Sequence, residues 1–332
     1  MKKTLTVTIP SYNVEQYLQQ TLDSFIEDSI MEDIEVLIVD DGSKDHTAEI
    51  GHAYETRYPD TFRLISKENG GHGSTINTGI EVGTGKYFKV VDGDDWVHTE
   101  DFVKLVQQLK TCDADYVLTN YYEVDDGTKV QTEKTFTNFK DGQVYEFGQV
   151  VEYTSLPMHA LVIRTNILKE HQIRLDEHCF YVDVEYTMFP VPYVHKIVYF
   201  DLYVYMYRLA LVTQSVSMQG YQKHMQNHID VILHLTDFAN HCMEQGEEEV
   251  KTCYMITRIA QMINDQVSVF LSFGTKNKKI KAQFQEFDAT MKEKNTAIYQ
   301  KAGTYSTTLW LLRKTKFRGY HIIGTLCRIK NG

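Results

Sequence analysis

The stretch KYFKVVDGDDW, residues Lys86 to Trp96, decides how the rest of the sequence is organised. A short apolar strand, predicted over 87–91, runs directly into three carboxylates at Asp92, Asp94 and Asp95. Acids this close repel one another unless a cation lies between them, and a divalent cation with oxygen ligands fits that chemistry. On this stretch alone, a solvated acidic turn in which Asp95 caps the next helix explains the pattern equally well.

Similar polar clusters follow the other predicted strands of the first 110 residues. Strands are predicted over 4–9, 34–39 and 62–66, and helical segments alternate with them. Such alternation is typical of an α/β fold with a doubly wound, mostly parallel sheet, in which ligands bind outside the carboxyl ends of the strands. The clusters at these ends are Pro10–Asn13, Asp40–Ser43, Asn69–Gly73 and Asp92–Asp95. Four clusters on one edge of the sheet predict a ligand site there.

The alternation stops near residue 120, and the rest of the chain changes character. Residues 121–147 are predicted to form β-hairpins, and 197–207 an aromatic strand. Beyond 220 the pattern is helical, with helices expected over 221–272 and 276–301. We therefore predict a sheet domain over 1–217 and a helical C-terminal region over 218–332.

Composition narrows the class of protein. The 332 residues are 42% hydrophobic and 24% charged, as in an ordinary soluble globular protein. The net charge of −11, concentrated in the first 110 residues, argues against nucleic acid as a partner. The five cysteines are scattered without a CxxC pair, which favours free thiols in a reducing compartment. Without a signal peptide or an apolar stretch of membrane-spanning length, we expect a cytoplasmic protein.

Several well-known nucleotide and nucleophile motifs are missing. The first strand is followed by PSYN, with neither GxGxxG nor GxxxxGK[ST], so a dinucleotide site and a P-loop are not expected. No serine nucleophile elbow is present. The glycine-rich loop NGGHG at 69–73 opens a predicted helix and can bring backbone N–H groups close to phosphate oxygens.

Taken together, these segments resemble the family 2 nucleotide-sugar glycosyltransferases, which have the Rossmann-like GT-A fold. The resemblance covers most of residues 4–110, is looser over 150–217, and ends near 220. It implies a nucleotide-sugar half at 1–110 and an acceptor half at 111–217. The matching segments are TVTIPSYNVEQYLQQTLDSF, EVLIVDDGSKDHTAEI, NGGHGSTINTGIEVGTGKYFKVVDGDDW and, more weakly, YVDVEYTMFP.

The resemblance assigns expected roles to the residues at the strand ends. Asp92 and Asp94 would form the DxD motif that holds Mn²⁺ or Mg²⁺ against the donor phosphates, with Asp92 towards the ribose. Asp94 is the preferred direct ligand and Asp95 an alternative. The remaining donor contacts would be Pro10, Ser11 and Tyr12 at the base and ribose, Asp41 or Asp40 at the base, and Asn69, Gly70, Gly71 and Gly73 beside the donor.

The expected catalytic base lies in the weaker match. The family's usual Glu-Asp pair is replaced here by Val182-Asp183, so the resemblance points to Asp183, with Glu185 as the alternative. Both acids are also explained by a helix N-terminus, where carboxylates are favoured anyway. His159 is a further candidate for contact with donor sugar or metal, although a lone histidine among apolar residues is more often part of the core.

Two more segments resemble family features less closely. Arg208 and residues 214–217 correspond to a segment that lies near the diphosphate in relatives, although the usual charged, glycine-bearing version is absent. A QxxRW motif is also absent, which argues against a processive polymer synthase. Trp96 is expected to pack under the acidic loop rather than stack on sugar.

The resulting functional hypothesis is a metal-dependent, inverting hexosyltransferase. It would move a sugar from a nucleoside-diphosphate sugar, with UDP favoured, to a hydroxyl of a saccharide or lipid-linked acceptor in cell-surface polysaccharide or glycolipid synthesis. The alternatives are a sugar-1-phosphate nucleotidyltransferase, whose GxGTR-type loop is absent, and a non-catalytic nucleotide-sugar-binding protein.

The C-terminal tail has the opposite charge to the rest of the chain. From Lys294 to Gly332 there are eight Lys or Arg residues and no Asp or Glu. Residues 305–332 form a basic amphipathic segment, which suits peripheral contact with the inner face of an anionic membrane. Packing on an acidic domain, or on a second subunit in a homo-oligomer, explains the same pattern.

Overall fold

The computed structural model describes residues 3–209, 217–323 and 325. The chain divides into two compact units, Met1–Leu211 and Val212–Gly332. This division lies a few residues before the boundary predicted at 217–218. Each unit is described by itself below.

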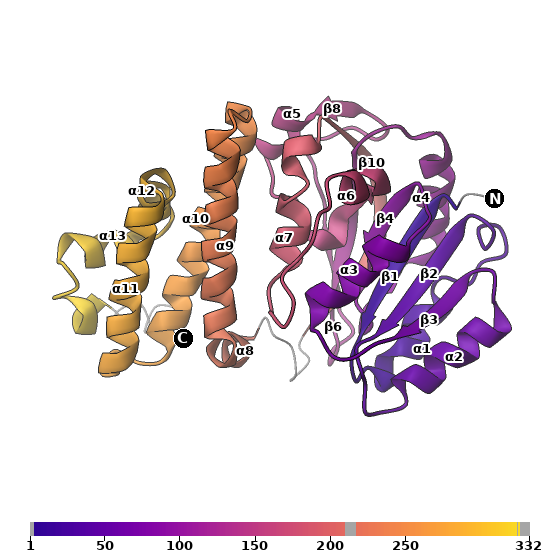
Figure 1. The fold of residues 1–332 in the computed structure, drawn as a ribbon, viewed down its shortest axis with the longest axis horizontal. Helices are drawn as coiled ribbons and strands as arrows, with labels where there is room; N and C mark the ends of the chain where they lie inside the picture. The colour runs from indigo at the N-terminus through magenta and orange to yellow at the C-terminus, as the bar shows by residue number, and fades with distance from the viewer. Residues whose placement is uncertain (1–2, 210–216, 324, 326–332) are drawn as a thin grey trace. The chain divides into compact units, whose positions relative to one another are not determined.

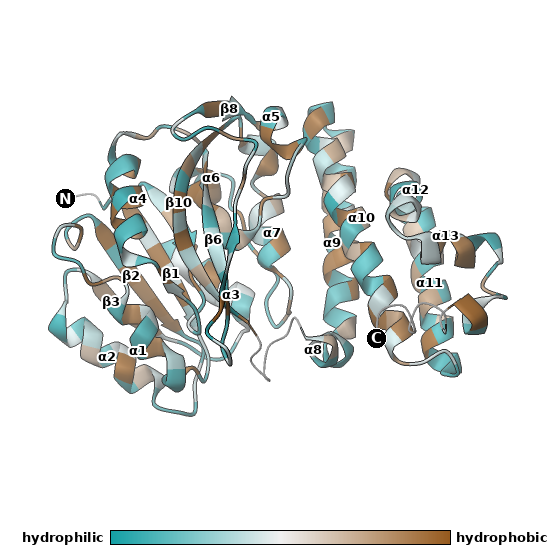
Figure 2. Ribbon diagram, turned by 180° about the vertical axis from the view of Figure 1, so that it is seen from behind, coloured by the Kyte–Doolittle hydropathy of each residue, from teal (hydrophilic) through white to brown (hydrophobic). Residues whose placement is uncertain are grey.

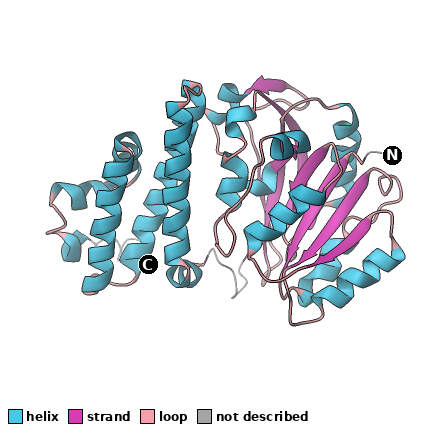
Figure 3. Ribbon diagram, in the orientation of Figure 1, coloured by secondary structure: helices cyan, strands magenta, loops and turns pink. Residues whose placement is uncertain are grey.

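The first unit is built on one mostly parallel sheet (Figures 1 and 3). Strands β1 (Leu5–Ser11), β2 (Ile34–Asp40), β3 (Phe62–Ser66) and β4 (Tyr87–Val90) pair in parallel in the order β3-β2-β1-β4. The sheet continues through β9 (Leu161–Arg164), β6 (Tyr116–Asp125), β10 (Lys196–Leu209) and β5 (Trp96–Val97). Strand β9 runs antiparallel to both β4 and β6, whereas β6 and β10 are parallel.

Short strands complete the sheet within the described residues: β7 (Gln131–Lys134) pairs with β6, and β8 (Val144–Glu146) pairs with β10. The short helix α5 (Phe147–Val151) follows β8. The predicted α/β fold class is confirmed. The sequence pattern also predicts a short strand over 161–163, which is β9, but it does not predict that this strand is antiparallel.

Helices cover both faces of the sheet because side chains alternate along each strand. On one face, Leu5, Val7 and Ile9 share a core with helices α1 (Glu15–Asp23), α2 (Thr47–Arg57) and α4 (Thr99–Thr111). The other face carries α3 (His72–Val82), α6 (Thr165–Glu170) and α7 (Asp183–Met188). Gly79 of α3 lies so close to this face that an added Cβ would be 2.3 Å from Thr8 Oγ1. The sheet is therefore doubly wound, as predicted.

The second unit is helical throughout its described part. Its helices are α8 (Met218–Lys223), α9 (Met225–Glu244), α10 (Glu249–Ser272), α11 (Lys278–Lys294), α12 (Thr296–Tyr305) and α13 (Thr307–Lys314). The helices carry apolar and polar residues together, whereas apolar residues dominate β2 of the first unit (Figure 2). No helix in the described ranges is both long and apolar enough to cross a membrane.

One predicted helix, over 276–301, is wrong: it is two helices separated at Asn295. Asn295 has an extended backbone (φ −154°), and its side chain accepts a hydrogen bond from the Ile298 N–H at 2.9 Å. This is an N-cap, which starts α12 as a new helix. The apolar periodicity continues across the break, which explains why the pattern suggested one helix.

Candidate active site

The acidic loop after β4 is pressed against the end of β1. The Gly93 N–H donates to the Pro10 carbonyl at 3.1 Å. A Cβ on Gly93 would lie 2.9 Å from that carbonyl oxygen and 3.0 Å from Val14 Cγ2, so only glycine fits. The Thr21 hydroxyl bonds the carbonyls of Gly93 (3.0 Å) and Asp95 (2.6 Å) from the other side. Two of the four predicted polar clusters are thus joined through backbone contacts.

Asp95 is the buried member of the three acids. It is 1% exposed, and its carboxylate accepts from the Tyr205 hydroxyl at 2.6 Å and from the Arg208 N–H at 2.7 Å. The Tyr205 oxygen also accepts from the Asp92 N–H at 3.1 Å. Burial, together with the charges of Asp94 and Asp92, raises the pKa of Asp95 well above its usual range. Asp95 therefore ties the loop to β10.

Arg208 holds the same loop through its guanidinium. Its Nε donates to the Asp94 carbonyl (2.6 Å), and its Nη atoms contact Asp126 (2.6 Å) and Gln20 (2.8 Å). The group also lies 4.6 Å from the centre of the Trp96 ring and 4.8 Å from that of Tyr17. A guanidinium held on so many sides is suited to fixing the loop rather than to meeting a diphosphate. Of the segment expected beside it, residues 214–216 lie outside the described residues.

Asp92 and Asp94 are the acids that remain partly exposed. The Asp92 side chain is 25% exposed, and its Oδ1 lies 2.8 Å from His72 Nε2. Burial alone would raise the pKa of Asp92, but the charge and hydrogen bond of His72 lower it. Burial and the charge of Asp92 raise the pKa of Asp94 to about 6. The loop therefore carries more negative charge than its neighbours neutralise, which is the situation that a bound cation relieves.

The glycine-rich loop is held by Asp41. The two oxygens of this carboxylate accept from the Gly70 and Gly71 N–H groups, each at 2.8 Å, and Lys67 Nζ lies 3.0 Å away. Asn69 donates its side-chain N–H to the Asp41 carbonyl at 2.9 Å. This carboxylate is buried and already engaged, so its geometry suits loop positioning. Asp40, also buried, accepts from the Ser43 N–H at 3.1 Å.

The end of β1 supplies the expected base pocket residues. Pro10 and Ser11 are buried, and the Ser11 hydroxyl donates to the Ile9 carbonyl at 3.1 Å. Tyr12 is 51% exposed and offers an open aromatic ring at this edge. Among these three, Tyr12 has the exposure that stacking on a ligand requires.

A loop from the later part of the unit brings Asp183 to this edge. Its segment before Asp183 is fastened to α3 by Asn77, which donates to the Leu175 carbonyl (2.9 Å) and accepts from the Leu175 N–H (2.8 Å). A Cβ on Gly73 would come within 2.0 Å of the Asp176 carbonyl oxygen. Asp183 then begins α7, and its charge is among the causes that raise the pKa of His72.

Glu185, the alternative base, lies in a different environment. It is 0% exposed and accepts from the Asp176 N–H at 2.8 Å. It therefore supports the loop that carries Asp183 from the inside, where a substrate hydroxyl does not reach.

His159 lies beside the acidic loop and under aromatic rings. Its imidazole stacks 4.0 Å from the Tyr207 ring, and burial lowers its pKa to about 4. Ligand-type atoms of Asp92, Asp95 and His159 lie within 4.8 Å of one another, which is close enough for one metal ion. The neutral imidazole suits a divalent cation. The group differs from the expected one, since His159 takes the place of Asp94.

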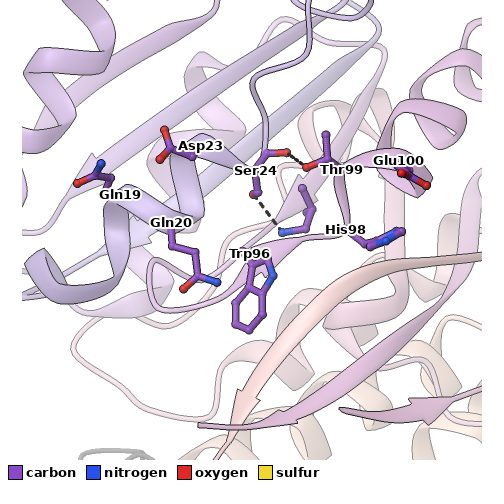
Figure 4. Close-up of a pocket in the computed structure, with 9 residues that line it drawn as sticks. Gln19, Gln20, Asp23, Ser24, Trp96, His98, Thr99 and Glu100 are labelled. Atoms are coloured by element: carbon purple, nitrogen blue, oxygen red, sulfur yellow. Dashed lines mark hydrogen bonds between the residues drawn. The ribbon is translucent and has the colours of Figure 1, made fainter. Parts of the chain in front are cut away.

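A separate hollow of about 750 Å³ opens on the other side of Arg208. Figure 4 shows Trp96 and Gln20 on one side of it and His98 and Glu100 on the other. Its lining contains none of the predicted donor or metal residues. The candidate site at the strand ends is thus distinct from this hollow.

The sequence patterns missed two residues of this edge. His72 lies inside the quoted NGGHG loop, three residues after Asn69. Its place in this loop could therefore have indicated that it belongs to the site. Tyr205, which bridges Asp92 and Asp95, is more than a hundred positions from either acid, and no local pattern indicates it.

These features define an α/β unit with an acidic loop at the switch point of its sheet. The profile described as "Glycosyl transferase family 2" matches residues 6–169. This segment, just under half of the chain, belongs to the family.

Several curated relatives are similar over part of their length. "Uncharacterized glycosyltransferase EpsJ" of Bacillus subtilis is 34% identical over 36% of this chain and 34% of its own. "Glycosyltransferase GlyG" of Streptococcus pneumoniae is 35% identical over 38% of this chain and 42% of its own. "Putative glycosyltransferase EpsH" of Bacillus subtilis is 25% identical over 79% and 77%. The chain thus spans less than half of the first two relatives.

Solved structures share the fold over nearly the whole chain. S. aureus TarS 1–349 in complex with UDP-GlcNAc has a TM-score of 0.66 and 17% identity, covering 98% of this chain and 92% of that one. Mannosyltransferase PcManGT from Pyrobaculum calidifontis, in complex with GDP-Man and Mn²⁺, has a TM-score of 0.52 and 15% identity, covering 98% and 87%.

Proposed function

We propose that this protein is a metal-dependent, inverting glycosyltransferase that uses a nucleoside-diphosphate sugar. The observation that carries the proposal is the juxtaposition of partly exposed, electrostatically strained carboxylates at Asp92 and Asp94 with Asp183 on a neighbouring loop. Membership of family 2 supports the transferase class over a nucleotidyltransferase.

The donor would lie along the carboxyl ends of β1, β2 and β4. Tyr12 would stack on the base, Asp40 would accept from it, and the loop of Asn69, Gly70, Gly71 and Gly73 would pass beside the sugar and phosphates. UDP is the favoured nucleotide, in keeping with the UDP complexes of the TarS fold relative. In this proposal Asp41 acts through the loop that it holds.

Asp92 and Asp94 would hold Mn²⁺ or Mg²⁺, with the neutral His159 beside them and Asp95 as the buried support of the loop. Carboxylate oxygens are suitable ligands for such an ion, and its positive charge would offset the negative charge of Asp92 that helps to raise the pKa of Asp94. When bound, the ion supplies Lewis-acid stabilisation of the diphosphate leaving group.

Asp183 would act as the general base. An acceptor hydroxyl gives its proton to Asp183 while its oxygen forms a bond to the anomeric carbon. The bond from that carbon to the phosphate oxygen breaks, and its electron pair leaves with the nucleoside diphosphate. A single displacement inverts the anomeric centre. General-base help of this kind contributes about 10²–10⁴-fold to the rate.

The first test is a thermal-shift screen of UDP-, GDP- and other nucleotide sugars with and without Mn²⁺. We expect a Mn²⁺-dependent shift with one nucleotide class, and its loss in Asp94→Asn. Asp60→Asn, an exposed acid in a turn outside the site, is the matched control. Binding without transfer would favour the non-catalytic alternative, and no response to any donor would contradict the proposal.

The acceptor is proposed to be a saccharide or lipid-linked hydroxyl of the cell envelope. A matching relative is named "Minor teichoic acid biosynthesis protein GgaB" (36% identical over 29% of this chain and 11% of its own), which agrees with this class. Self-association of the chain stays a prediction.

Peripheral membrane contact is proposed in a modified form. Leu309, Leu312, Phe317 and Tyr320 are buried, and Arg313 pairs with Asp288, so this part of the tail's apolar side is already used. Trp310 (49% exposed) and Ile322 (70%) remain available near exposed Lys314, Lys316 and Arg318. These are the residues that would meet an anionic lipid surface.

Point substitutions test this contact better than deletion of 305–332, which would remove buried leucines. We expect W310S/I322S to lose co-sedimentation with anionic vesicles, while Val130→Ser, an exposed apolar residue of the sheet unit, retains it. Equal binding by both variants would contradict the membrane proposal.

A further inference from the structure

The feature that carries a further inference is His72, the first residue of α3. Its Nε2 lies 2.8 Å from Asp92 Oδ1, so the glycine-rich loop and the acidic loop meet at this one side-chain contact. The imidazole is 31% exposed, which leaves part of it open to solvent at the edge where the donor is proposed to lie.

The backbone around His72 is held firmly. Gly71 before it has φ +84°, and its N–H donates to Asp41. The Thr75 hydroxyl bonds the His72 carbonyl at 2.6 Å. A side chain on so rigid a base can change its partner by rotation of its own torsions, without movement of the loop.

The surroundings of His72 are negative. The carboxylates of Asp92, Asp183 and Asp94 lie near its imidazole. These are the groups proposed to take a cation and a proton. When a cation neutralises Asp92, the imidazole loses its present partner at the moment when a diphosphate arrives beside it.

Three other described cationic side chains near these loops are engaged with protein groups. Lys67 contacts Asp41, the Glu68 carbonyl and Ser74. Lys89 is buried and donates to the His159 and Leu161 carbonyls. Arg208 is fixed under the acidic loop, as described above. These three side chains are therefore held by the protein, whereas the His72 imidazole is partly exposed.

We infer that His72 is a diphosphate-binding residue, which the Asp92 contact holds in place until the donor and its cation bind, and which then donates to a diphosphate oxygen. The inference rests on the proposed function and adds to it an imidazole N–H group that donates to the leaving group. It predicts that His72 contributes to binding of the diphosphate and not of the nucleoside.

The test compares His72→Gln with wild type by calorimetry, using uridine, UDP and inorganic pyrophosphate, each with Mn²⁺. Loss of one charge-assisted hydrogen bond should weaken UDP and pyrophosphate roughly ten- to hundredfold and leave uridine unchanged. His52→Gln is the matched control, because this exposed histidine of α2 pairs with Glu55 and lies outside the site.

A second readout uses Mn²⁺ alone. Because His72→Gln frees Asp92 from the imidazole, the affinity for Mn²⁺ should stay equal or rise, which separates lost phosphate contact from a collapsed loop. Equal UDP affinity in variant and wild type would overturn the inference alone. Absence of any nucleotide or pyrophosphate binding by the wild type would overturn the proposed function, and this inference with it.

Discussion

Two buried arginines, one in each unit, have similar partners but different surroundings. Arg208 pairs with Asp126 and lies against Trp96 and Tyr17. Arg313 pairs with Asp288 at 2.6 Å and lies 3.5 Å from the Tyr299 ring centre. In addition to its pair with Asp126, Arg208 holds the loop that carries the three carboxylates of residues 92–95. Arg313 lies in the segment 294–332, which contains no Asp or Glu. An arginine–aspartate pair of this kind thus stabilises the structure, whereas accessible acids in addition to such a pair indicate a ligand site.

The largest expected difference between the two regions comes from their aspartates. Asp183→Asn should lower turnover by about 10²–10⁴-fold, because the amide cannot accept the acceptor's proton, while donor affinity is kept. Asp288→Asn should leave turnover intact and lower stability, because Arg313 then lies buried without its counter-charge. Transfer rates and calorimetric donor affinities measure both. Near-normal turnover in Asp183→Asn would move the base elsewhere.

Removal of the arginines tests the comparison directly. Arg208→Met and Arg313→Met should each lower the free energy of unfolding by about 3 kcal/mol. Arg313→Met removes the paired cation of Asp288, whereas Arg208→Met removes the hydrogen bonds to the Asp94 carbonyl and Gln20, and Asp126 keeps its pair with Lys129. Only Arg208→Met should also weaken Mn²⁺-dependent donor binding, because its loop carries Asp92 and Asp94. Urea unfolding and calorimetry separate the two effects. Equal donor affinities in the two variants would remove the proposed link between Arg208 and the site.

The effect of pH should appear in the acidic loop. The pKa of Asp94 is raised to about 6, so its folded form binds a proton more tightly than the unfolded chain does. Its contribution to stability is therefore present at low pH and is lost as pH rises through about 6. Mn²⁺ should raise the melting temperature strongly at pH 7 and weakly at pH 5, where a proton competes. Asp94→Asn, as control, should remove the difference, and equal Mn²⁺ shifts at both pH values in wild type would contradict it.

The smallest effect concerns two glycines. Gly246→Ala, in the helical unit, should cost only about 1 kcal/mol, because its φ is +78° but no atom lies within 4 Å of an added Cβ. Gly73→Ala should lower stability and, unlike Gly246→Ala, should weaken donor binding as well. Its Cβ would push the loop of Asp176 and Asp183 away from α3. Melting curves and UDP titrations check both. Unchanged UDP affinity in Gly73→Ala would show that this loop contact does not affect the donor edge.

Much of the sheet unit was predictable because its signals are local. The alternation of strands and helices over the first 110 residues, with polar residues after each strand, follows from periodicity alone. The hairpin region and the antiparallel β9 were harder, since a short apolar strand of four residues fits either direction. The break at Asn295 was missed because a capping asparagine does not interrupt the apolar pattern around it.

The sequence by itself determined that three carboxylates follow β4 and that an aspartate lies near the start of a later helix. Only the tertiary structure decided which of them stay accessible. Asp95 is buried by Tyr205 and Arg208 of β10, whereas Asp92 and Asp94 remain at the open edge. Glu185, two residues after Asp183, likewise points into the unit. The charge of an acid is a property of the residue, but its exposure and its pKa depend on distant segments that pack around it. For this reason neighbouring acids of the same kind take different roles: some hold the loops in place, and others line the candidate site.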